Sequence, residues 1–468
     1  MRTVDLRSGP ILLKSALTDE GRFLTTERAA SWLKATAAER PQVVDQIPFD
    51  GLGQWFFEDQ TGDLVHRSGK FFRVTGVRVN TDLGPQRQWE QPIIDQPEIG
   101  ILGILAREFD GVLHLLMQAK MEPGNPLGVQ LTPTVQATRS NYTQVHQGTR
   151  PPYLDYFLDR DHSTVIVDQL QWEHGSAFLR KRNRNIVVRV TGDVPVEPGF
   201  NWLTLAQVKK LLTQPNLVSM DTRTVIACLP LIGAPGAMEA THASGFGAAV
   251  LESFASTEAA STDEELQSWL TELKCLHRLV VDEVGLSSVS AWRRTEREIS
   301  HEGGDFFKVI AVDVTSASRE VARWTQPMIA PVAPGFIAFL TTEINGVLHA
   351  LVKARAEPGS GDTVIVGPTV QSALGFEGSD LEGDHGPFLE LVRKAEEKDI
   401  RYSCVQSEEG GRFYHVQSEY RIVHMERGHL LALPPSYRWL SLRQLQDMVR
   451  YGLLSVEARS LLSCLSFT

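Results

Sequence analysis

Two charged residues in the first half of the chain could carry out chemistry. Lys120 and Glu122 stand directly before a Pro-Gly pair, and Arg355 and Glu357 repeat the arrangement later in the chain. A cation beside a carboxylate at a strand end can hold a phosphate, stabilise an enolate or move a proton. A surface ion pair of little energetic consequence is the alternative, and the residues themselves leave it open.

A second polar group lies a short distance further along. Residues 139–142 read Arg-Ser-Asn-Tyr, and His146 comes four residues after Tyr142. Tyrosine and histidine are suitable proton carriers, histidine especially near neutral pH. An ordinary polar loop would have the same composition. The later copy has lost these groups, since the matching positions hold Leu374, Gly375, Phe376, Glu377 and Leu381. The difference predicts one competent site and one altered site.

A basic cluster, Lys181-Arg182-Asn183-Arg184-Asn185, precedes an apolar stretch at 186–190. An acidic protein needs such a patch to hold a diphosphate, and guanidinium groups suit that geometry best. Arg182 and Arg184 are therefore the candidates. A solvated hairpin end is the alternative for each residue.

Several tryptophans could stack on a nucleobase. They are Trp55, Trp89, Trp172, Trp292 and Trp324. Core packing is the alternative for those that recur in both copies, and the same applies to the recurring histidines His66 and His301.

These groups belong to one long unit that is written twice. Residues 89–138 align with 324–373 at a constant offset of 235, without a gap and with 21 identities over 50 positions. Further matches extend the repeat in both directions. The period is far longer than a solenoid repeat, so each copy is interpreted as a domain. We expect an N-terminal arm at 1–24, repeats at 25–229 and 262–468, and an Ala/Gly/Ser-rich linker at 230–261.

A hairpin within the repeat is the clearest local prediction. Asp110-Gly111, and Asn345-Gly346 in the second copy, stand between apolar runs and favour a type I′ turn. Alternation after the first turn places His114, Gln118 and Lys120 on one strand face. Helices are predicted from Thr25 to about Arg40 and after a capping-box pattern at 261–264. The fold class is α+β, with mostly antiparallel sheets flanked by helices.

Composition excludes several classes of protein. With 42% apolar and 22% charged residues, the 468-residue chain can bury substantial cores. A formal net charge of −11 disfavours nonspecific binding to nucleic acid or to an anionic membrane. The four cysteines show no CxxC spacing, and no signal peptide or 18-residue apolar run is apparent, so we expect a cytoplasmic protein.

Common catalytic motifs are missing from the sequence. There is no GxGxxG after a strand, no Walker A loop, no HExxH and no GxSxG. The stretch from Arg278 to Gly285 faintly resembles the end of a Nudix box. However, Glu264 and Leu270 stand where that box requires a glycine and a glutamate, so no metal-binding pyrophosphatase helix is encoded and no metal site is predicted.

Three stretches together resemble a known family. Residues 122–125 (EPGN), 133–143 (PTVQATRSNYT) and 181–185 (KRNRN) are similar to the NDP-hexose 2,3-dehydratases, and the likeness extends over essentially the whole chain. The resemblance implies two Nudix-like domains and a homodimer. It also implies a carbon–oxygen lyase that acts on a dTDP-4-keto-6-deoxyhexose in deoxysugar and antibiotic biosynthesis, with a 3-ketoreductase acting next. The steps of such a dehydration require no cofactor.

The resemblance also suggests which residues form the site. Lys120, Glu122, Tyr142 and His146 would be catalytic. Substrate would be bound by Trp55, His66, Gln118, Thr134, Gln136, Arg139, Ser140, Asn141, Trp172, Arg182 and Arg184. A second nucleotide site would involve Trp292, Arg355, Glu357, Gln371 and Tyr414. A Nudix-type nucleotide-sugar hydrolase and a non-catalytic sugar-nucleotide-binding protein are the alternatives.

Overall fold

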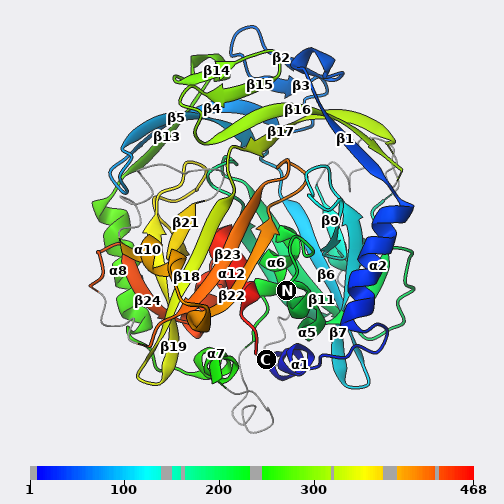
Figure 1. Cartoon of the computed structure of the whole chain (residues 1–468), viewed down its shortest axis with the longest axis vertical. Helices are drawn as coiled ribbons and strands as arrows, with labels where there is room; N and C mark the ends of the chain where they lie inside the picture. Colours follow the sequence, from blue (N-terminus) through cyan, green and yellow to red (C-terminus); the bar gives the residue numbers. More distant parts are fainter. Residues whose placement is uncertain are drawn as a thin grey trace.

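The computed structural model describes residues 8–138, 150–159, 164–231, 245–317, 321–372, 387–426 and 432–467. Two similar halves lie side by side, each built on a seven-stranded sheet with helices around it, and two curved five-stranded sheets lie across one end of the molecule (Figure 1). The prediction of a duplicated α+β fold is confirmed.

The first half of the chain, including the segment before the first repeat, supplies six of the helices that the structure describes. They are α1 (Gly9–Ala16), α2 (Thr26–Glu39), α4 (Asp155–Leu158), α5 (Leu205–Leu211), α6 (Met220–Ala227) and the short 3-10 helix η1 (Phe49–Gly51). Its strands are β1 (Gln42–Ile47), β2 (Trp55–Phe57), β3 (Leu64–His66), β4 (Arg73–Thr81), β5 (Gln88–Asp95), β6 (Gly100–Phe109), β7 (Val112–Met121), β8 (Val129–Thr132), β9 (Val135–Ala137), β10 (Thr164–Trp172), β11 (Arg182–Val190) and β12 (Phe200–Thr204).

The second half of the chain, including the segment between the repeats, follows the same order. Its helices are α7 (Gly245–Ala255), α8 (Asp263–Leu276), α10 (Pro387–Arg393), α11 (Leu442–Arg450), α12 (Val456–Cys464), η2 (Leu286–Ser288) and η3 (Glu397–Asp399). Its strands are β13 (Leu279–Val284), β14 (Trp292–Arg294), β15 (Glu298–His301), β16 (Phe307–Ser316), β17 (Arg323–Pro331), β18 (Gly335–Ile344), β19 (Val347–Arg355), β20 (Ile365–Pro368), β21 (Val370–Ser372), β22 (Ile400–Ser407), β23 (Gln417–His424) and β24 (Tyr437–Ser441).

The two seven-stranded sheets have the same topology. The strand order is β10-β11-β6-β7-β12 in the first sheet and β22-β23-β18-β19-β24 in the second. In the first sheet β8 also pairs with β7 and β9 with β6; in the second, β20 pairs with β19 and β21 with β18. The pairs β11–β6 and β23–β18 are parallel, and the other neighbours are antiparallel. The predicted hairpins are confirmed, because φ is 50° at Asp110, 75° at Gly111, 53° at Asn345 and 79° at Gly346.

The five-stranded sheets join the two repeats. Strand β1 of the first repeat pairs with β16 of the second, from Gln42 opposite Ser316 to Ile47 opposite Ala311. Conversely, β13 of the second repeat pairs with β4 of the first. Figure 1 shows β1 running from α2 into the sheet that contains β16 and β17. Each five-stranded sheet therefore draws strands from both repeats, and the sequence boundaries do not separate two bodies in space.

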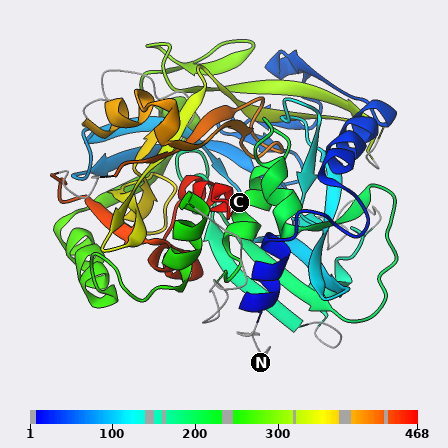
Figure 2. The same cartoon turned by 60° about the horizontal axis from the view of Figure 1, so that its bottom comes forward.

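The segments expected to be an arm and a linker each contain a buried helix. In α1, Ser15 Oγ lies 2.5 Å from the carbonyl oxygen of Leu113 and accepts from the backbone N–H of Leu205. In α7, Ser253 makes the same two contacts with Leu348 and Leu442. Both helices come forward in Figure 2, on the face opposite the five-stranded sheets. The arm and linker interpretations are corrected here, because apolar side chains of both helices are buried.

Helix α8 begins one residue later than predicted. Thr262 is the N-cap, and its side chain exchanges hydrogen bonds with Glu265 in a capping box, whereas the sequence pattern suggested Ser261 and Glu264. The apolar face is as expected, since Leu266, Trp269, Leu270 and Leu273 are all buried. Helix α2 is capped by Thr25, as predicted.

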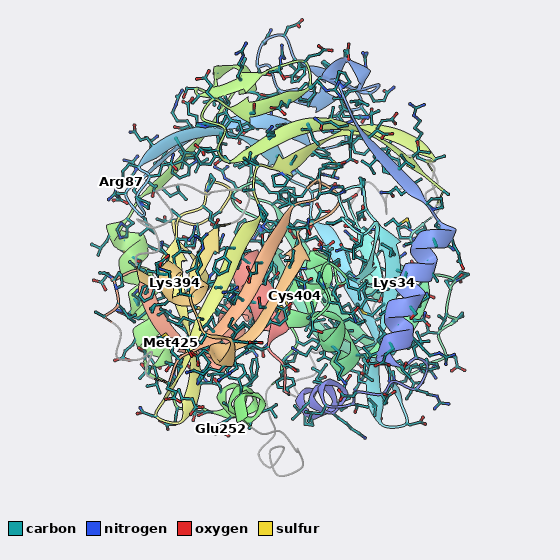
Figure 3. All side chains as sticks on the ribbon, viewed as in Figure 1. Lys34, Arg87, Glu252, Lys394, Cys404 and Met425 are labelled. Carbon is teal, nitrogen blue, oxygen red and sulfur yellow. The ribbon has the colours of Figure 1, made fainter. Side chains whose placement is uncertain are left out.

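The two halves share one hydrophobic core along the contact between α6 and α12. All four cysteines are free thiols, and Cys404 lies between the halves near the centre of Figure 3, whereas Lys34 and Lys394 lie towards opposite sides. Within the described ranges, no helix has the length and apolar character needed to cross a membrane.

Candidate active site

A large cavity of about 1390 Å³ lies over the seven-stranded sheet of the first half. Its floor comes from β6, β7, β9 and β11 of that sheet. The opposite wall comes from the aromatic residues near Trp55 and from Asp313, Arg323 and Trp324 of the second repeat. A volume of this size can hold a nucleotide sugar. Because strands are exchanged between the repeats, the cavity of the first half is closed by residues of the second.

The predicted pair of Lys120 and Glu122 lies at the cavity floor. Lys120 Nζ is 2.7 Å from Glu122 Oε1 and 2.8 Å from Gln136 Oε1, and both charged side chains are largely shielded from solvent. Lys120 and Gln136 come from β7 and β9, two strands that pack on the same sheet. A lysine held between a carboxylate and an amide is preorganised to stabilise negative charge that develops on a substrate.

Gln118 and Thr134 also line the cavity, as predicted. The hydroxyl of Thr134 is engaged by the protein itself, since it donates to the carbonyl of Leu116 and accepts from the backbone N–H of Leu105. Thr134 therefore positions β9 against the sheet, and its contribution to the wall is steric. The recurring Pro-Thr-Val-Gln pattern reflects this structural role, because Thr369 makes the same two bonds in the second half.

The Glu-Pro-Gly pattern has a structural explanation as well. Two loops cross between the halves: residues 173–181, the first crossover loop, and residues 408–416, the second crossover loop. The backbone N–H of Gly124 donates to the carbonyl of Gly410, and Gly359 makes the matching bond to Gly175. A Cβ at Gly124 would overlap the carbonyl oxygen of Phe413. Glycine is required there because the two backbones touch.

The second crossover loop brings two charged residues into the cavity of the first half. Glu409 and Arg412 both line it. Arg412 lies over the ring of Phe72, with 4.2 Å from its guanidinium carbon to the ring centroid, and its Nε donates to Gln96 Oε1. Sequence reasoning missed both residues, because nothing in the repeat indicates that a loop of one copy serves the site of the other.

Four carboxyl groups surround the cavity floor, and we call them the carboxyl cluster: Glu122, Glu173, Asp221 and Glu409. Burial raises the pKa of Asp221 well above its ordinary value, and the neighbouring charges of Glu409 and Glu173 add to the effect. Burial also raises the pKa of Glu409, although Arg412 opposes the shift. Asp221 was not predicted. Its position in the first turn of α6 gives no sequence signal.

Lys181 is buried beside this cluster and donates to the backbone carbonyl of Glu98. Burial lowers the pKa of Lys181, while Glu173 and Glu98 oppose the shift. Asn183 donates to Glu173 Oε1 at 2.7 Å and accepts from the backbone N–H of Gly100. Of the predicted basic cluster, it is therefore Lys181 and Asn183 that reach the cavity.

The two arginines of that cluster do not reach it. Arg184 forms a two-pronged ion pair with Asp168, with both distances 2.6 Å, on the other side of the strand. Arg182 is exposed and lies over the ring of Trp172, which packs against Gly361. The prediction that Trp172, Arg182 and Arg184 line the substrate site is corrected here, because strand alternation turns these side chains away from the cavity.

Trp55 and His66 do line the cavity, next to Phe71 and Phe72. The indole N–H of Trp55 donates to the carbonyl of Thr325, so its ring is held in place by the second repeat. The remaining predicted residues, Arg139, Ser140, Asn141, Tyr142 and His146, lie outside the described part of the chain.

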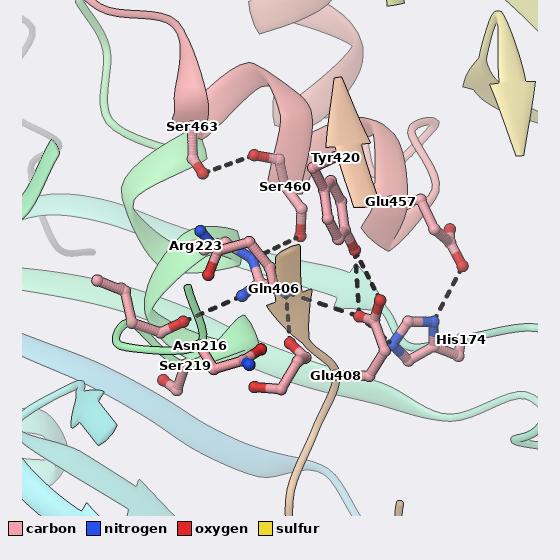
Figure 4. Close-up of polar contacts among 12 residues, drawn as sticks. His174, Asn216, Ser219, Arg223, Gln406, Glu408, Tyr420, Glu457, Ser460 and Ser463 are labelled. Atoms are coloured by element: carbon pink, nitrogen blue, oxygen red, sulfur yellow. Dashed lines mark hydrogen bonds and ion pairs between the residues drawn. The ribbon is translucent and has the colours of Figure 1, made fainter. Parts of the chain in front are cut away.

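The corresponding region of the second half is filled by a buried network (Figure 4). In His174 of the first crossover loop, Nδ1 lies 2.9 Å from Glu457 Oε1, and Nε2 lies 3.4 Å from Glu408 Oε2. The two carboxylates raise the pKa of His174 well above its ordinary value, against the effect of burial. Tyr420 donates to Glu408, and Arg223 lies 3.6 Å from it.

Three of the residues predicted to form a second nucleotide site, Arg355, Glu357 and Gln371, lie together. Gln371 donates to Glu357 Oε1 at 3.1 Å, and burial raises the pKa of Glu357 to about 7, with the charge of Glu457 adding to the effect. Arg355 lies close enough to Glu357 to oppose that shift. Trp292 donates to the carbonyl of Glu90, and the ring of Tyr414 stacks on His415.

Among the side chains that the structure describes, no three His, Cys, Asp or Glu residues are arranged to hold a metal ion. A large cavity with a carboxyl cluster, a fixed lysine and a guanidinium is suited to an enzyme that moves protons on an anionic, polar substrate. The chain belongs to the NDP-hexose 2,3-dehydratase family, whose pattern matches residues 26–229 and 263–465.

Three relatives have similar sequences over nearly their whole length, and each is named dTDP-4-dehydro-6-deoxy-alpha-D-glucopyranose 2,3-dehydratase. The protein from Saccharopolyspora spinosa is 48% identical over 453 residues, which cover 96% of this chain and 93% of that protein. The protein from Amycolatopsis orientalis is 44% identical, with 97% and 92% covered. The protein from Streptomyces violaceoruber is 43% identical, with 95% and 97% covered.

Proposed function

We propose that this chain removes the C2 hydroxyl of dTDP-4-dehydro-6-deoxyglucose as water and forms a 3,4-diketo-2,6-dideoxy sugar nucleotide. The observation that carries the proposal is Lys120, held between Glu122 and Gln136 on the cavity floor beside the carboxyl cluster. The C4 ketone makes the C3 proton acidic, so a base can remove it. The resulting enolate oxygen needs a cation, and Lys120 supplies one.

The remaining steps follow from the same chemistry. Once the enolate has formed, the C2 hydroxyl leaves as water when an acid protonates it. The C2=C3 product still carries the C3 hydroxyl, so it is an enol and tautomerises to the 3,4-diketone. Loss of water and tautomerisation need no external oxidant or reductant, so no redox cofactor is required.

The cavity suggests how the substrate is oriented. Phe71, which is 38% exposed and is backed by the buried rings of Trp55 and Phe72, offers aromatic surface for the thymine base, and the carboxyl cluster with Lys120 offers polar groups for the sugar. Arg412 lies between these regions, because it contacts Phe72 and follows Glu409 in the second crossover loop. We therefore assign the diphosphate to Arg412 in place of Arg182 and Arg184.

Tyr142 and His146 remain proposed proton carriers, with Glu122 as a further candidate. Replacing Tyr142 by Phe and His146 by Ala, one at a time, tests them. We expect each change to reduce turnover by about 10²-fold or more if the side chain transfers a proton. Two fully active variants would remove both residues from the mechanism.

The experiment that tests the function is NMR of the purified protein with dTDP-4-dehydro-6-deoxyglucose in D₂O, with EDTA and without nicotinamide. We expect loss of the C3 proton signal and elimination at C2, followed by release of dTDP from the unstable product. In a parallel sample with magnesium in place of EDTA, cleavage of the diphosphate would indicate a Nudix-type hydrolase instead. Tight binding without any change in the substrate would indicate a binding protein.

Other expectations also remain proposals. The reactive diketone product calls for a reductase that acts at C3 immediately afterwards, and a coupled assay with such an enzyme would trap the product. A homodimer is implied by the family resemblance and can be checked by light scattering. A cytoplasmic location agrees with the four free thiols. The second-half residues Trp292, Arg355, Glu357, Gln371 and Tyr414 are proposed to bind nucleotide, which titration with dTDP would test.

A further inference from the structure

Two carboxyl groups of the cluster are not engaged by a charged or amide side chain. Glu122 pairs with Lys120, and Glu173 accepts from Asn183. Asp221 is only 4% exposed and lines the cavity, and its carboxyl group makes no hydrogen bond to any other residue within the described ranges. Glu409 accepts the backbone N–H of Gly411 at Oε1, whereas its buried Oε2 has no partner in the same part of the chain.

The two groups come from opposite halves, and one arginine fixes them relative to each other. Arg223 lies two residues after Asp221 on α6, and its Nη1 donates to the carbonyl of Val218 at 3.0 Å. Its Nη2 donates at 2.8 Å to the carbonyl of Ser407, two residues before Glu409. Arg223 is fully buried and stands at the centre of Figure 4. The start of α6 and the start of the second crossover loop are therefore tied to one guanidinium.

The charge balance of the floor favours one bound proton. The carboxyl cluster has four acids, and the buried or partly buried cations beside it are Lys120, Lys181 and Arg412. Glu98 lines the same cavity and lies close enough to Lys181 and Arg412 to act on their charges, so the floor holds more carboxyl groups than cations, and this excess favours retention of a proton. Asp221 is the group with the strongest reason to keep it, because burial and two neighbouring carboxylates both raise its pKa.

We propose that Asp221 and Glu409 are the acid and the base of the dehydration, so that each half of the chain supplies one proton carrier. This inference rests on the proposed function. It assigns the proton transfers to this pair in place of Tyr142, His146 and Glu122, and it leaves Glu122 as the partner that positions Lys120. It also explains how the second repeat takes part in a reaction that occurs in the cavity of the first.

The proton balance closes without an external acid or base. The Glu409 carboxylate takes the C3 proton, and the electron pair of the C3–H bond becomes the enolate. Asp221 then gives its proton to the C2 hydroxyl, the C2–O bond breaks, and water leaves with that electron pair. In the tautomerisation, protonated Glu409 gives a proton to C2 while the Asp221 carboxylate takes the proton of the C3 hydroxyl. The pair finishes with the single proton it began with.

The second half lacks this pair. At the constant offset of 235, the position of Glu409 corresponds to His174 in the first crossover loop, which is hydrogen-bonded to Glu457 and lies 3.4 Å from Glu408. An imidazolium between two carboxylates cannot act as a base. The cavity of the first half and the matching region of the second half therefore differ in the residue that the crossover loop of the other half supplies: Glu409 in the first case and His174 in the second.

The test uses Asp221→Asn and Glu409→Gln in the full chain, with Asp193→Asn as the control. Asn and Gln keep the shape of a protonated carboxyl group, so the fold is least disturbed. Asp193 pairs with Arg107 on the surface and does not line the cavity. Three quantities are measured: elimination at C2, exchange of the C3 proton for deuterium, and affinity for dTDP.

We expect Asp221→Asn to lose about 10²- to 10⁴-fold in elimination while C3 exchange persists, because the base is intact. Glu409→Gln should lose both elimination and exchange. Affinity for dTDP should change little in either variant, and the control should behave like the parent protein. Either variant turning over at the parent rate would overturn the inference. Loss of dTDP binding together with a lower unfolding temperature would assign the pair a structural role and would also overturn it.

A parent protein that neither exchanges nor eliminates would refute the proposed function before any variant is made. The two failures are therefore distinguishable.

Discussion

Replacing His174 by Gln should destabilise the whole molecule, because this side chain connects the two halves through buried charge. His174 lies between Glu457 and Glu408, all three side chains are about 1% exposed, and Oε2 of Glu457 already has no hydrogen-bond partner within the described ranges. Glu408 would keep Tyr420 and Arg223. The change would therefore leave mainly Glu457 as a buried carboxylate without its cation.

The expected magnitude follows from that contact. Removing one partner of a buried ion pair costs about 3–5 kcal/mol. The Gln amide can restore one hydrogen bond, which contributes about 0.5–1.5 kcal/mol. We therefore expect the free energy of unfolding to fall by about 2–4 kcal/mol, as measured by urea or thermal denaturation near pH 6.

The pH dependence gives a sharper test. The pKa of His174 is raised in the folded protein, so its contribution is fully present below about pH 6.5, the unfolded value, and is lost as pH rises through the folded pKa. The destabilisation caused by His174→Gln should therefore shrink as pH rises.

His349→Gln is the matched control. His349 is equally buried, but its Nδ1 donates to the carbonyl of Val347 and its Nε2 accepts from the N–H of Ala260, so the ring is neutral. Burial lowers its pKa, so its contribution is present above about pH 6.5 and is lost as pH falls. The two variants should show opposite pH trends. A loss below about 1 kcal/mol for His174→Gln, or a loss that grows with pH, would refute the reasoning.

Three further changes test other parts of the structure. Gly124→Ala should lower the unfolding temperature and abolish turnover, because the added Cβ would overlap the carbonyl oxygen of Phe413. Gly192→Ala is the control: a Cβ at Gly192 would meet no other atom, so the same assays should show little effect. Arg412→Gln should weaken dTDP binding by about 10- to 100-fold in calorimetry, which is the loss of one charge-assisted hydrogen bond; unchanged affinity would remove Arg412 from the diphosphate site. Glu357→Gln should flatten the pH dependence of stability between about pH 4.5 and 7, because the raised pKa makes folding less favourable as the group ionises over that range; an unaltered slope would mean that Glu357 titrates normally.

Several features could be predicted from the sequence because they depend on local patterns. The Asp110-Gly111 and Asn345-Gly346 pairs set the hairpins, since their residues accept the positive φ of the turn. Strand alternation predicted that Gln118 and Lys120 lie on one strand face, and both side chains line the cavity in the structure. The repeat itself established two similar halves.

Side-chain direction on one strand was harder to predict. Arg182 and Arg184 looked suited to a diphosphate, yet the register of β11 with β10 and β6 turns them away and brings in Asn183 and its neighbour Lys181. A cluster of charges in the sequence shows which residue types are available, whereas the register decides which of them reach a cavity.

The sequence by itself determined the duplication, the hairpin turns and the pair of Lys120 and Glu122, because these follow from self-similarity, turn chemistry and periodicity along the chain. Only the tertiary structure decided how the halves combine. In a duplicated chain, β1 has almost the same choice of partners in either copy, so pattern alone cannot distinguish pairing within a repeat from pairing between repeats. The structure pairs β1 with β16 and carries Glu409 and Arg412 across to the first cavity. Contacts of this kind are set by packing between residues hundreds of positions apart, where no local rule applies.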